Sequence, residues 1–382
     1  MTETSNVEMA GPGAGPAYAV VTGGGTSGHV LPALAVADAL VAAGHDSSTI
    51  RYVGAQRGIE TRLLPETPYP HEFLDVVGAQ RRLTRANLGF VPKMARSTQA
   101  ATRLLRAWRP RVVVSVGGYA SMPSVFAARR LGIPVVVVSY DRTPGRASRL
   151  AARTAAACAV AFEQSPLPNA ELTGAPVRQA ILDVDRSSDA RRLSARQALG
   201  VDPDRFVIAV MGGSLGSGVL NDAIATYVRD HCDDAELAVR QIAGERFAGR
   251  VEAVVGEVQH QVVAYENDMA AVYAACDLVI GRGGASTVHE VAVTGTPAIL
   301  VPWAASADDH QRDNVAWLSE VGGAELLLEP DIGRLGATID ALRSDDGRRA
   351  ELGQAARRRG AVHRSGALAG LIERVALTST PS

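Results

Sequence analysis

The sequence predicts an α/β protein with two doubly wound domains, each built on a parallel sheet of the Rossmann type, that face each other across a cleft. The length of 382 residues suits two domains. Short runs rich in valine and isoleucine lack polar alternation, which is typical of strands buried on both faces of a parallel sheet. These runs alternate with helical patterns, and the alternation occurs twice along the chain.

The first domain is predicted over residues 17–178, after a Gly- and Pro-rich stretch at 1–16 that we expect to be a flexible tail rather than a secretory signal. Its strands are expected at 17–22, 49–54, 111–116, 134–138 and 156–161. Its helices are expected at 31–43, 92–108 and 122–131.

The second domain is predicted over residues 179–355, with the hinge placed at the T-G-A-P-V-R segment 173–178 and the polar stretch 183–190 that follows it. Its strands are expected at 206–211, 237–242, 261–265, 278–280 and 298–301, with a helix at 221–228. Residues 356–382 are predicted to form helices that return to the first domain.

The composition is that of an ordinary globular chain. Apolar residues make up 47% and charged residues 21%, which excludes a disordered chain and a collagen-like or coiled-coil fibre. Aromatic residues make up only 4%, so the cores must be aliphatic. The three cysteines lie far apart without a C-x-x-C motif, which predicts neither a zinc ribbon nor a disulfide framework and favours a reduced compartment. No apolar run approaches the ~20 residues of a membrane-spanning helix.

Charge is unevenly distributed along the chain. Residues 1–178 carry a net charge of +8 and residues 179–382 one of −9. No acidic residue occurs between Asp75 and Asp141, and that stretch holds 11 basic residues. The basic stretch indicates either an anionic partner or a solvated helix and loop. Nucleic acid is not expected, because no known motif and no aromatic platform accompanies the charge.

Ligands of open parallel sheets bind beyond the carboxyl ends of the strands, so the strand-to-helix loops are the candidate sites. The loop 23–29 is rich in glycine and leads into a helix, whose N-terminal N–H groups can bind a phosphate. Its spacing matches neither a P-loop nor a standard NAD site, and a plain tight turn is the alternative. His29 stands beside the helix N-terminus, which disfavours its cationic form. It is either a neutral general base or a packing histidine.

Three further loops carry polar residues after predicted strands. The loop 212–218 contains Ser214, which could donate to a phosphate, and the loop 281–290 presents hydroxyls and Glu290 at another helix start. Tight turns and a helix-dipole carboxylate are the alternatives. The loop 302–314 is rich in side-chain donors and acceptors. Its consecutive Asp308, Asp309 and His310 make a poor cage, so no metal is expected.

Together the motifs closely resemble the MurG family of peptidoglycan N-acetylglucosaminyltransferases, which have the GT-B fold. The resemblance runs from about residue 17 to 330, with the motifs in order and at family-like spacing. The motifs that carry it are G-G-G-T-S-G-H at 23–29, V-G-G-Y-A-S-M-P at 116–123, G-A-P-V-R at 174–178, G-G-S-L-G-S-G-V-L-N at 212–221, G-R-G-G-A-S-T-V-H-E at 281–290 and D-D-H-Q-R-D-N at 308–314.

The resemblance implies an inverting transfer of N-acetylglucosamine from UDP-N-acetylglucosamine to the C4 hydroxyl of the muramoyl sugar of lipid I, giving lipid II and UDP without a cofactor. His29 and Glu290 are the implied catalytic residues, with His29 as the candidate base. In this reading Glu290 binds the ribose, Gln311 and Asn314 hold the sugar, and Arg178 and helix N-termini take the diphosphate charge. The implied donor-binding residues are Thr26, Ser27, Gly28, Asp141, Arg178, Ser214, Ala285, Ser286, Thr287, Val288, His289, Glu290, Gln311 and Asn314.

The resemblance also gives the basic stretch a role at an anionic membrane surface, where the lipid-linked acceptor lies. The chain is then expected to be peripheral at the cytoplasmic face of the cell membrane, with other cell-wall synthesis and division proteins as further partners. The residues expected to contact the membrane or the acceptor are Arg81, Arg82, Arg85, Leu88, Phe90, Lys93 and Tyr119.

Three positions depart from the family pattern. Ser27 replaces a usual glycine, and Glu266 replaces a usual apolar residue near the uracil side. The segment 138–141 reads V-S-Y-D where the family usually reads H-E-Q-N, so Asp141 stands in the place of the asparagine. A carboxylate accepts hydrogen bonds but cannot donate them. The sequence thus leaves open a lipid I transferase, a related GT-B transferase with another acceptor, and a catalytically silent UDP-sugar-binding scaffold.

Overall fold

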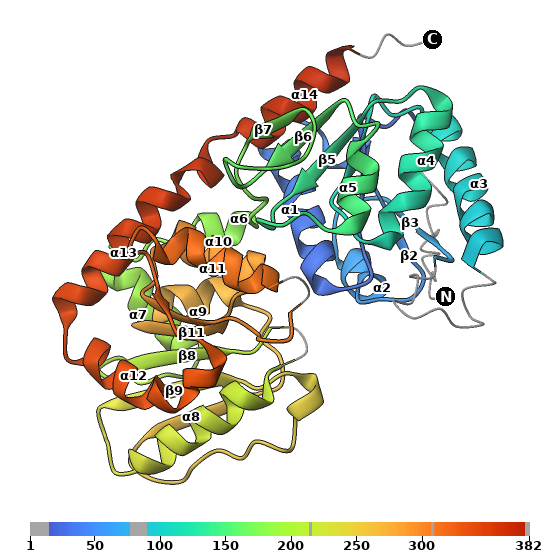
Figure 1. Cartoon of the computed structure of the whole chain (residues 1–382). Coiled ribbons are helices and arrows are strands. Elements are labelled where there is room, and N and C mark those ends of the chain that lie inside the picture. The colour runs from blue at the N-terminus through green and yellow to red at the C-terminus, as the bar shows by residue number, and fades with distance from the viewer. Residues whose placement is uncertain (1–14, 77–89, 214–215, 307–308, 379–382) are drawn as a thin grey trace, which may run out of the picture.

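The computed structural model describes residues 15–76, 90–213, 216–306 and 309–378, and within these ranges the chain forms two parallel sheets (Figure 1). The seven-stranded sheet has the order β3-β2-β1-β4-β5-β6-β7. Its strands are β1 (Ala19–Thr22), β2 (Ile50–Ala55), β3 (His71–Leu74), β4 (Val112–Ser115), β5 (Val135–Ser139), β6 (Ala157–Val160) and β7 (Ala170–Leu172). The described six-stranded sheet has the order β10-β9-β8-β11-β12-β13. Its strands are β8 (Phe206–Met211), β9 (Leu237–Ile242), β10 (Gln259–Val263), β11 (Leu278–Arg282), β12 (Ala298–Val301) and β13 (Glu325–Leu326).

Helices cover both faces of the first sheet because successive strand residues point to opposite sides and both sides are apolar. On one face, Val20, Val113 and Val137 join a core with α3, α4 and α5. On the other face, Val21 and Val114 join a core with α1 and α14. These helices are α1 (Ser27–Ala42), α3 (Phe90–Trp108), α4 (Met122–Leu131), α5 (Arg146–Ala152) and α14 (Ala367–Thr378), and the short α2 (Glu60–Leu63) precedes β3.

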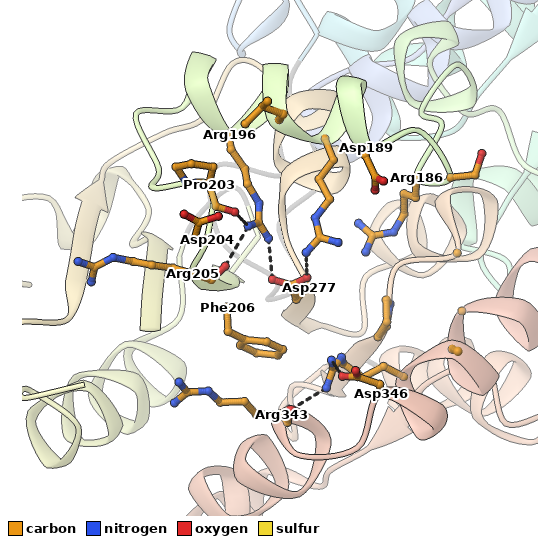
Figure 2. A pocket seen from close by; sticks show the side chains of 18 of the residues that line it. Arg186, Asp189, Arg196, Pro203, Asp204, Arg205, Phe206, Asp277, Arg343 and Asp346 are labelled. Carbon is orange, nitrogen blue, oxygen red and sulfur yellow. Dashed lines mark hydrogen bonds and ion pairs between the residues drawn. The ribbon is translucent and has the colours of Figure 1, made fainter. Parts of the chain in front are cut away.

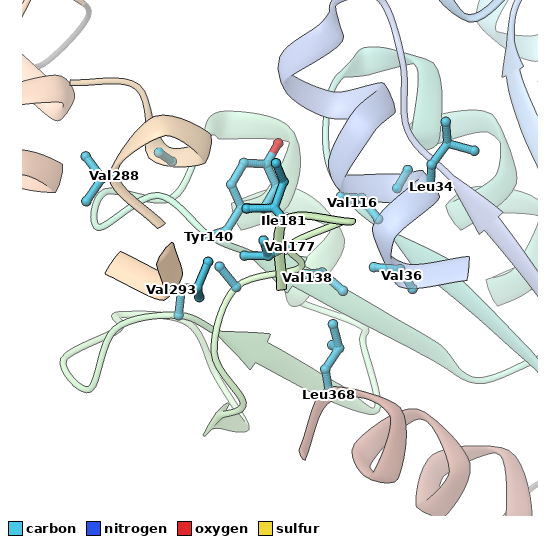
Figure 3. Packing of buried hydrophobic residues seen from close by; sticks show 14 of the residues in the cluster. Leu34, Val36, Val116, Val138, Tyr140, Val177, Ile181, Val288, Val293 and Leu368 are labelled. Carbon is cyan, nitrogen blue, oxygen red and sulfur yellow. The ribbon is translucent and has the colours of Figure 1, made fainter. Parts of the chain in front are cut away.

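The core on the α1 face continues without a break into the second domain. Tyr140, after β5, belongs to the same buried cluster as Ile181 and Val288 of the second half (Figure 3). The second sheet packs its other face, including Ile208 and Val210, on a separate core. The helices of this half are α6 (Gln179–Leu182), α7 (Asp189–Ala198), α8 (Gly218–Asp230), α9 (Met269–Ala275), α10 (Ala285–Thr294), α11 (His310–Ser319), α12 (Leu335–Arg343) and α13 (Asp346–Gly360).

The predicted fold class of two doubly wound domains is confirmed, with differences at particular elements. The helix predicted from residue 31 begins at Ser27, because Thr26 is extended and its carbonyl already accepts the N–H of Val30 at 3.1 Å. The strand predicted at 261–265 is β10, which lies two residues earlier. Strands β3, β7 and β13 were not predicted, since none is a continuous buried apolar run.

The C-terminal helices connect the two domains a second time. Helix α13 packs against α10 of the second domain, whereas α14 packs against α1, β4 and β6 of the first domain. Figure 1 shows the C-terminal helices passing from the second domain to the first. Among the helices of the described residues, none combines the length and the hydropathy needed to cross a membrane.

The α10–α13 contact is close enough for backbones to touch. A Cβ atom built on Gly360 would lie 2.6 Å from the backbone carbon and oxygen of Ala292. By contrast, a Cβ on Gly370 in α14 would meet no atom nearer than Nη1 of Arg374, at 3.9 Å. The two helical glycines therefore serve as a matched pair of sites for substitution.

We predict that Gly360→Ala lowers the free energy of unfolding by about 1–3 kcal/mol, because the added methyl group must push α13 away from α10. Gly370→Ala should instead raise it by up to about 1 kcal/mol, because alanine is the better helix former and the site is open. Denaturant unfolding of both variants measures the two effects. A Gly360→Ala protein as stable as the wild type would show that this close packing is not a constraint.

Candidate functional site

A pocket of about 590 Å³ lies beyond the carboxyl ends of β1, β4 and β5. First-domain loops form most of it, and His310 of α11 adds a side chain from the second domain. The lining residues of the first domain are His29, Val116, Gly118, Tyr119, Val138, Ser139, Tyr140, Asp141, Thr143, Pro144, Gly145, Arg146, Ala147, Ser148 and Arg149. Its position at these strand ends is the one from which parallel sheets usually bind ligands.

His29 lies in the first turn of α1 and contributes a half-buried imidazole to this pocket. Its Nδ1 is 2.8 Å from the hydroxyl of Tyr140. Burial lowers the pKa of His29, while Asp141 and Glu60 act in the opposite direction. A pKa below the ordinary value of 6.5 keeps the ring neutral at pH 7, and a neutral ring can accept a proton.

The glycine-rich loop before α1 is held from behind by a buried carboxylate. Oε1 of Glu60 accepts the N–H groups of Gly25 at 3.0 Å and Ala55 at 3.1 Å. A Cβ on Gly24 would lie 2.4 Å from that same oxygen, so only glycine allows Glu60 to come so close. Thr26 and Gly28 are exposed on the solvent side of the loop. Ser27 starts α1, and its side chain lies outside the described atoms.

Residues 141–143 contact α11 of the second domain. The side chain of Asn314 donates to Oδ1 of Asp141 at 3.1 Å, and its own Oδ1 accepts the backbone N–H of Arg142 at 2.9 Å. The hydroxyl of Thr143 donates to Asp313 at 3.2 Å. Asp141 and Asn314, both expected at the donor, thus bind each other across the two domains. Gln311, on the same helix, accepts the backbone N–H of Trp303 at 2.9 Å.

Glu290 lies on α10 and has two protein partners. Arg178, which directly precedes α6, approaches its Oε1 at 3.3 Å, and the hydroxyl of Tyr273 donates to Oε2 at 3.0 Å. Burial raises the pKa of Glu290, and the nearby Arg178 opposes this rise. The structure therefore brings two predicted donor residues, Arg178 and Glu290, into one ion pair beside the start of α10.

The first turns of α10 place the other predicted donor residues together. Ala285 and Val288 are buried, whereas Ser286 and Thr287 are half-buried at the helix N-terminus. His289 is buried with both ring nitrogens engaged: Nε2 lies 2.8 Å from the carbonyl oxygen of Tyr140, and Nδ1 lies 3.0 Å from Nε2 of His363. Any ligand contact by His289 must therefore come from its backbone.

The contacts of the two histidines define where their protons are. The N–H of Ala175 donates to Nδ1 of His363 at 2.9 Å, so the proton of His363 is on Nε2. That proton is donated to Nδ1 of His289, and His289 in turn donates from Nε2 to Tyr140. Burial lowers the pKa of His289 to about 4 and that of His363 well below its ordinary value. Both rings are thus neutral and join Ala175, α10 and the first domain.

Comparison with known proteins identifies the family of this chain. Residues 19–160 match the glycosyltransferase family 28 N-terminal domain, and residues 207–365 match the C-terminal domain of the same family. A UDP-N-acetylglucosamine--N-acetylmuramyl-(pentapeptide) pyrophosphoryl-undecaprenol N-acetylglucosamine transferase from Nocardioides sp. is 39% identical over 344 residues, covering 88% of this chain and 92% of the relative. The relative of the same name from Desulforudis audaxviator is 34% identical over 374 residues, covering 94% and 98%.

This chain belongs to the MurG family. The crystal structure of Acinetobacter baumannii MurG agrees, with a TM-score of 0.67 and 26% identity over 94% of this chain and all of that one. A UDP-GlcNAc 2-epimerase from Neisseria meningitidis reaches a TM-score of 0.66 at 14% identity over 94% of this chain and all of that one, and so shares the fold alone. The resemblance and the GT-B architecture predicted from the sequence are confirmed.

Several site residues predicted for this MurG-family chain are outside the described residues or only partly described. Ser214, Arg81, Arg82, Arg85 and Leu88 lie outside the described residues. Phe90 begins α3, but its side chain is not described. Lys93 is half-buried on α3, and Tyr119 is 38% exposed at the edge of the pocket. These roles remain predictions.

Sequence reasoning missed four residues that shape the site: Glu60, Tyr140, Tyr273 and His363. None lies in a motif, and each binds at least one partner that is 17 or more residues away in the sequence. Only Tyr140 carried a signal, because it lies in the segment that departs from the MurG pattern. That signal indicated a contact with the donor or acceptor substrate rather than a hydrogen bond to His29.

A second hollow, of about 1350 Å³, lies on the second domain and is lined by arginine and acidic side chains (Figure 2). Arg192 and Arg196 both pair with Asp277, which also accepts the N–H of Val207 at 2.7 Å. These contacts lie at the amino-terminal starts of β8 and β11, opposite to the ligand-binding ends of the strands. Because both arginines already pair with Asp277 and these contacts join α7 to the sheet, we assign no ligand to this hollow.

We predict that the neutral histidine pair makes the free energy of unfolding fall as the pH is lowered from about 6.5 to 4. In this range an unfolded histidine, with a pKa near 6.5, binds a proton that buried His289, with a pKa of about 4, does not bind. Between pH 7.5 and 5, His289 alone should account for a loss on the order of 2 kcal/mol.

Denaturant unfolding across this pH range measures the loss. The His363→Gln variant is the control, because glutamine keeps an amide donor beside His289 but does not titrate. Its stability should depend less steeply on pH than that of the wild type, with the contribution of His260 common to both proteins. Parallel pH profiles would contradict the assignment of neutral rings to this pair.

Proposed function

We propose that this chain transfers N-acetylglucosamine from UDP-N-acetylglucosamine to the C4 hydroxyl of the muramoyl sugar of lipid I, forming lipid II and UDP. The observation that carries the proposal is the neutral imidazole of His29, in a pocket at the carboxyl ends of the strands that both domains line. The names of the relatives support these substrates, and the geometry of this pocket supports His29 as the base.

In the proposed reaction the acceptor hydroxyl lies beside His29, which takes its proton as the oxygen attacks the anomeric carbon. The bond to UDP breaks on the opposite face, so the configuration inverts. Negative charge then grows on the diphosphate, near the N-terminal N–H groups of α10 and the guanidinium of Arg178. Arg178 has five N–H donors and uses one for Glu290, so it can remain paired while it binds a phosphate oxygen. This electrostatic stabilisation does not require a divalent ion.

We further propose that residues 17–178 and 179–355 act as the acceptor and donor domains, with 356–382 as a helical extension. The basic stretch of the first domain would hold the chain at the anionic cytoplasmic face of the cell membrane. The exposed Arg96, Arg103 and Arg106 on α3 support this proposal. Other cell-wall synthesis and division proteins are proposed as further partners.

A related transferase with a different lipid-linked or natural-product acceptor is the second candidate function. It is favoured by one observation: the departing segment 138–141 lines the pocket beside His29. A catalytically silent scaffold is disfavoured, because the chain has both His29, which lines the pocket, and Glu290, which pairs with Arg178.

UDP release in the presence of a lipid I analogue, compared with a panel of other lipid-linked and small-molecule acceptors, tests these alternatives. The proposal predicts the highest kcat/KM with the lipid I analogue. Preference for another acceptor would support the second candidate. Tight UDP-N-acetylglucosamine binding without release of UDP for any acceptor would leave only a scaffold.

We predict that His29→Ala lowers kcat about 10²–10⁴-fold, the usual range for removing a general base, while the Kd for UDP changes little. His71→Ala is the control, because this half-buried histidine of β3 is not among the residues that line the pocket. Steady-state kinetics and calorimetric UDP binding separate the two effects. An equal loss of turnover and UDP affinity would assign His29 to structure instead.

For membrane association, we predict that Arg81→Glu with Arg85→Glu lowers the partition coefficient onto anionic vesicles at least about tenfold at low salt, since each basic residue contributes about 1 kcal/mol. The effect should shrink at high salt, where charges are screened. The double variant Arg229→Glu with Arg358→Glu is the control, because it makes the same charge change on exposed residues of the second half of the chain. Salt-independent binding would contradict an electrostatic contact.

A further inference from the structure

Tyr140 lies between the two domains at the edge of the candidate site. It directly follows β5, is 6% exposed, and packs with buried side chains of both domains (Figure 3). Its carbonyl oxygen is already used by His289 at 2.8 Å. Its hydroxyl points the other way and meets the first turn of α1, where it contacts both His29 and Gly28.

The contact with Gly28 has a cause in the sequence of α1. In an α-helix the carbonyl of residue 28 would accept the N–H of residue 32. Residue 32 is a proline inside the helix and has no N–H to donate. The carbonyl of Gly28 is therefore left without its helical donor, and the hydroxyl of Tyr140 donates to it instead.

The donation to Gly28 determines which group is the donor in the hydrogen bond between Tyr140 and His29. Burial raises the pKa of Tyr140 well above its ordinary value, so the phenol keeps its single proton. That proton goes to Gly28, which as a carbonyl can only accept. The hydroxyl oxygen must then accept from Nδ1 of His29 across the 2.8 Å contact, which places the imidazole proton on Nδ1.

The ring of His29 is also held sterically. Gly118, at φ +74° in the loop after β4, packs on its edge, and a Cβ there would lie 2.9 Å from Cδ2 of the imidazole. Among the described residues no hydrogen bond to Nε2 of His29 is found. A neutral imidazole with its proton on Nδ1 carries its lone pair on Nε2, the nitrogen that is left to take a proton from the acceptor.

We propose that Tyr140 is a positioning residue that holds His29 in the Nδ1–H tautomer, so that Nε2 is the atom that accepts the proton of the acceptor hydroxyl. The inference rests on the proposed function. It adds that Nε2 of His29 is the accepting atom and that Tyr140 sets its protonation. When Nε2 takes the proton, Nδ1–H still donates to Tyr140, and this bond strengthens as the ring becomes cationic. In serine proteases, loss of the partner that fixes the tautomer of the histidine lowers kcat about 10⁴-fold.

Two variants differ only in which tyrosine loses its hydroxyl. Tyr140→Phe keeps the buried ring and the backbone contact with His289 but removes the acceptor for His29. Tyr52→Phe is the matched control, because the buried hydroxyl of Tyr52 donates to the carbonyl of Gly23 in the same loop at 2.7 Å and is not bonded to His29. The ¹⁵N chemical shifts of the His29 ring, assigned with His29→Gln, report the tautomer of the full chain without any substrate.

The wild type and Tyr52→Phe should show His29 with its proton on Nδ1, whereas Tyr140→Phe should show a population with the proton on Nε2. The kcat for the lipid I analogue should fall about 10–100-fold in Tyr140→Phe, with KM and UDP binding within about twofold of the wild type. An unchanged tautomer in Tyr140→Phe, or a changed tautomer with full kcat, would overturn the inference.

The double variant Tyr140→Phe with Pro32→Ala separates the two contacts of the hydroxyl. Alanine at position 32 restores an N–H for the Gly28 carbonyl but gives His29 no acceptor. A kcat that stays low supports the role through His29, whereas a restored kcat would mean that Tyr140 only satisfies Gly28 and would overturn the inference. A wild type that is inactive with every acceptor would contradict the proposed function, and the tautomer measurement would still decide the inference about Tyr140.

Discussion

The contact between the two domains depends on a hydrogen-bonded pair of neutral, buried imidazoles, His289 and His363. His289 donates to the carbonyl of Tyr140 and accepts from His363, which in turn accepts the N–H of Ala175. A buried polar group left without a partner costs about 1–3 kcal/mol, so each ring must act as one donor and one acceptor. The histidine pair therefore requires both rings to be neutral with the proton on Nε2, and in that state it holds the end of β5 against α10.

Three successive residues, 140–142, connect this histidine pair to the candidate site. Tyr140 binds α10 through its carbonyl and His29 through its hydroxyl, and Asp141 and Arg142 bind Asn314 of α11. The carbonyl of Tyr140 and the N–H of Arg142 are backbone groups. Other side chains at positions 140 and 142 could therefore keep these two contacts if the backbone conformation is the same. This explains how a MurG-family chain can carry other side chains in this segment and still hold its domains in register.

The sequence predicted those parts of the structure that are local. Continuous runs such as Val112–Ser115 are buried on both faces and were found, whereas the half-exposed β3 was missed because its burial depends on the neighbouring β2. His29 could be predicted from its place beside a helix start. Its partner Tyr140 could not, since the two are 111 residues apart and no local pattern links them. Arg178 and Glu290 were likewise both predicted, but their pairing was not.

The two hollows described above differ in a way that supports the choice of one of them as the proposed catalytic site. At the amino-terminal ends of β8 and β11, Arg192 and Arg196 both pair with Asp277, so an anion that binds these two arginines would compete with that carboxylate. At the carboxyl ends of β1, β4 and β5, the polar groups are also bonded, but their bonds orient them: Glu60 holds the loop from behind, and Tyr140 takes only Nδ1 of His29. Such a hydrogen bond occupies one polar atom of a side chain or loop and leaves another directed at the pocket. The free atom is then already oriented for substrate, so no reorganisation is needed when the reaction begins.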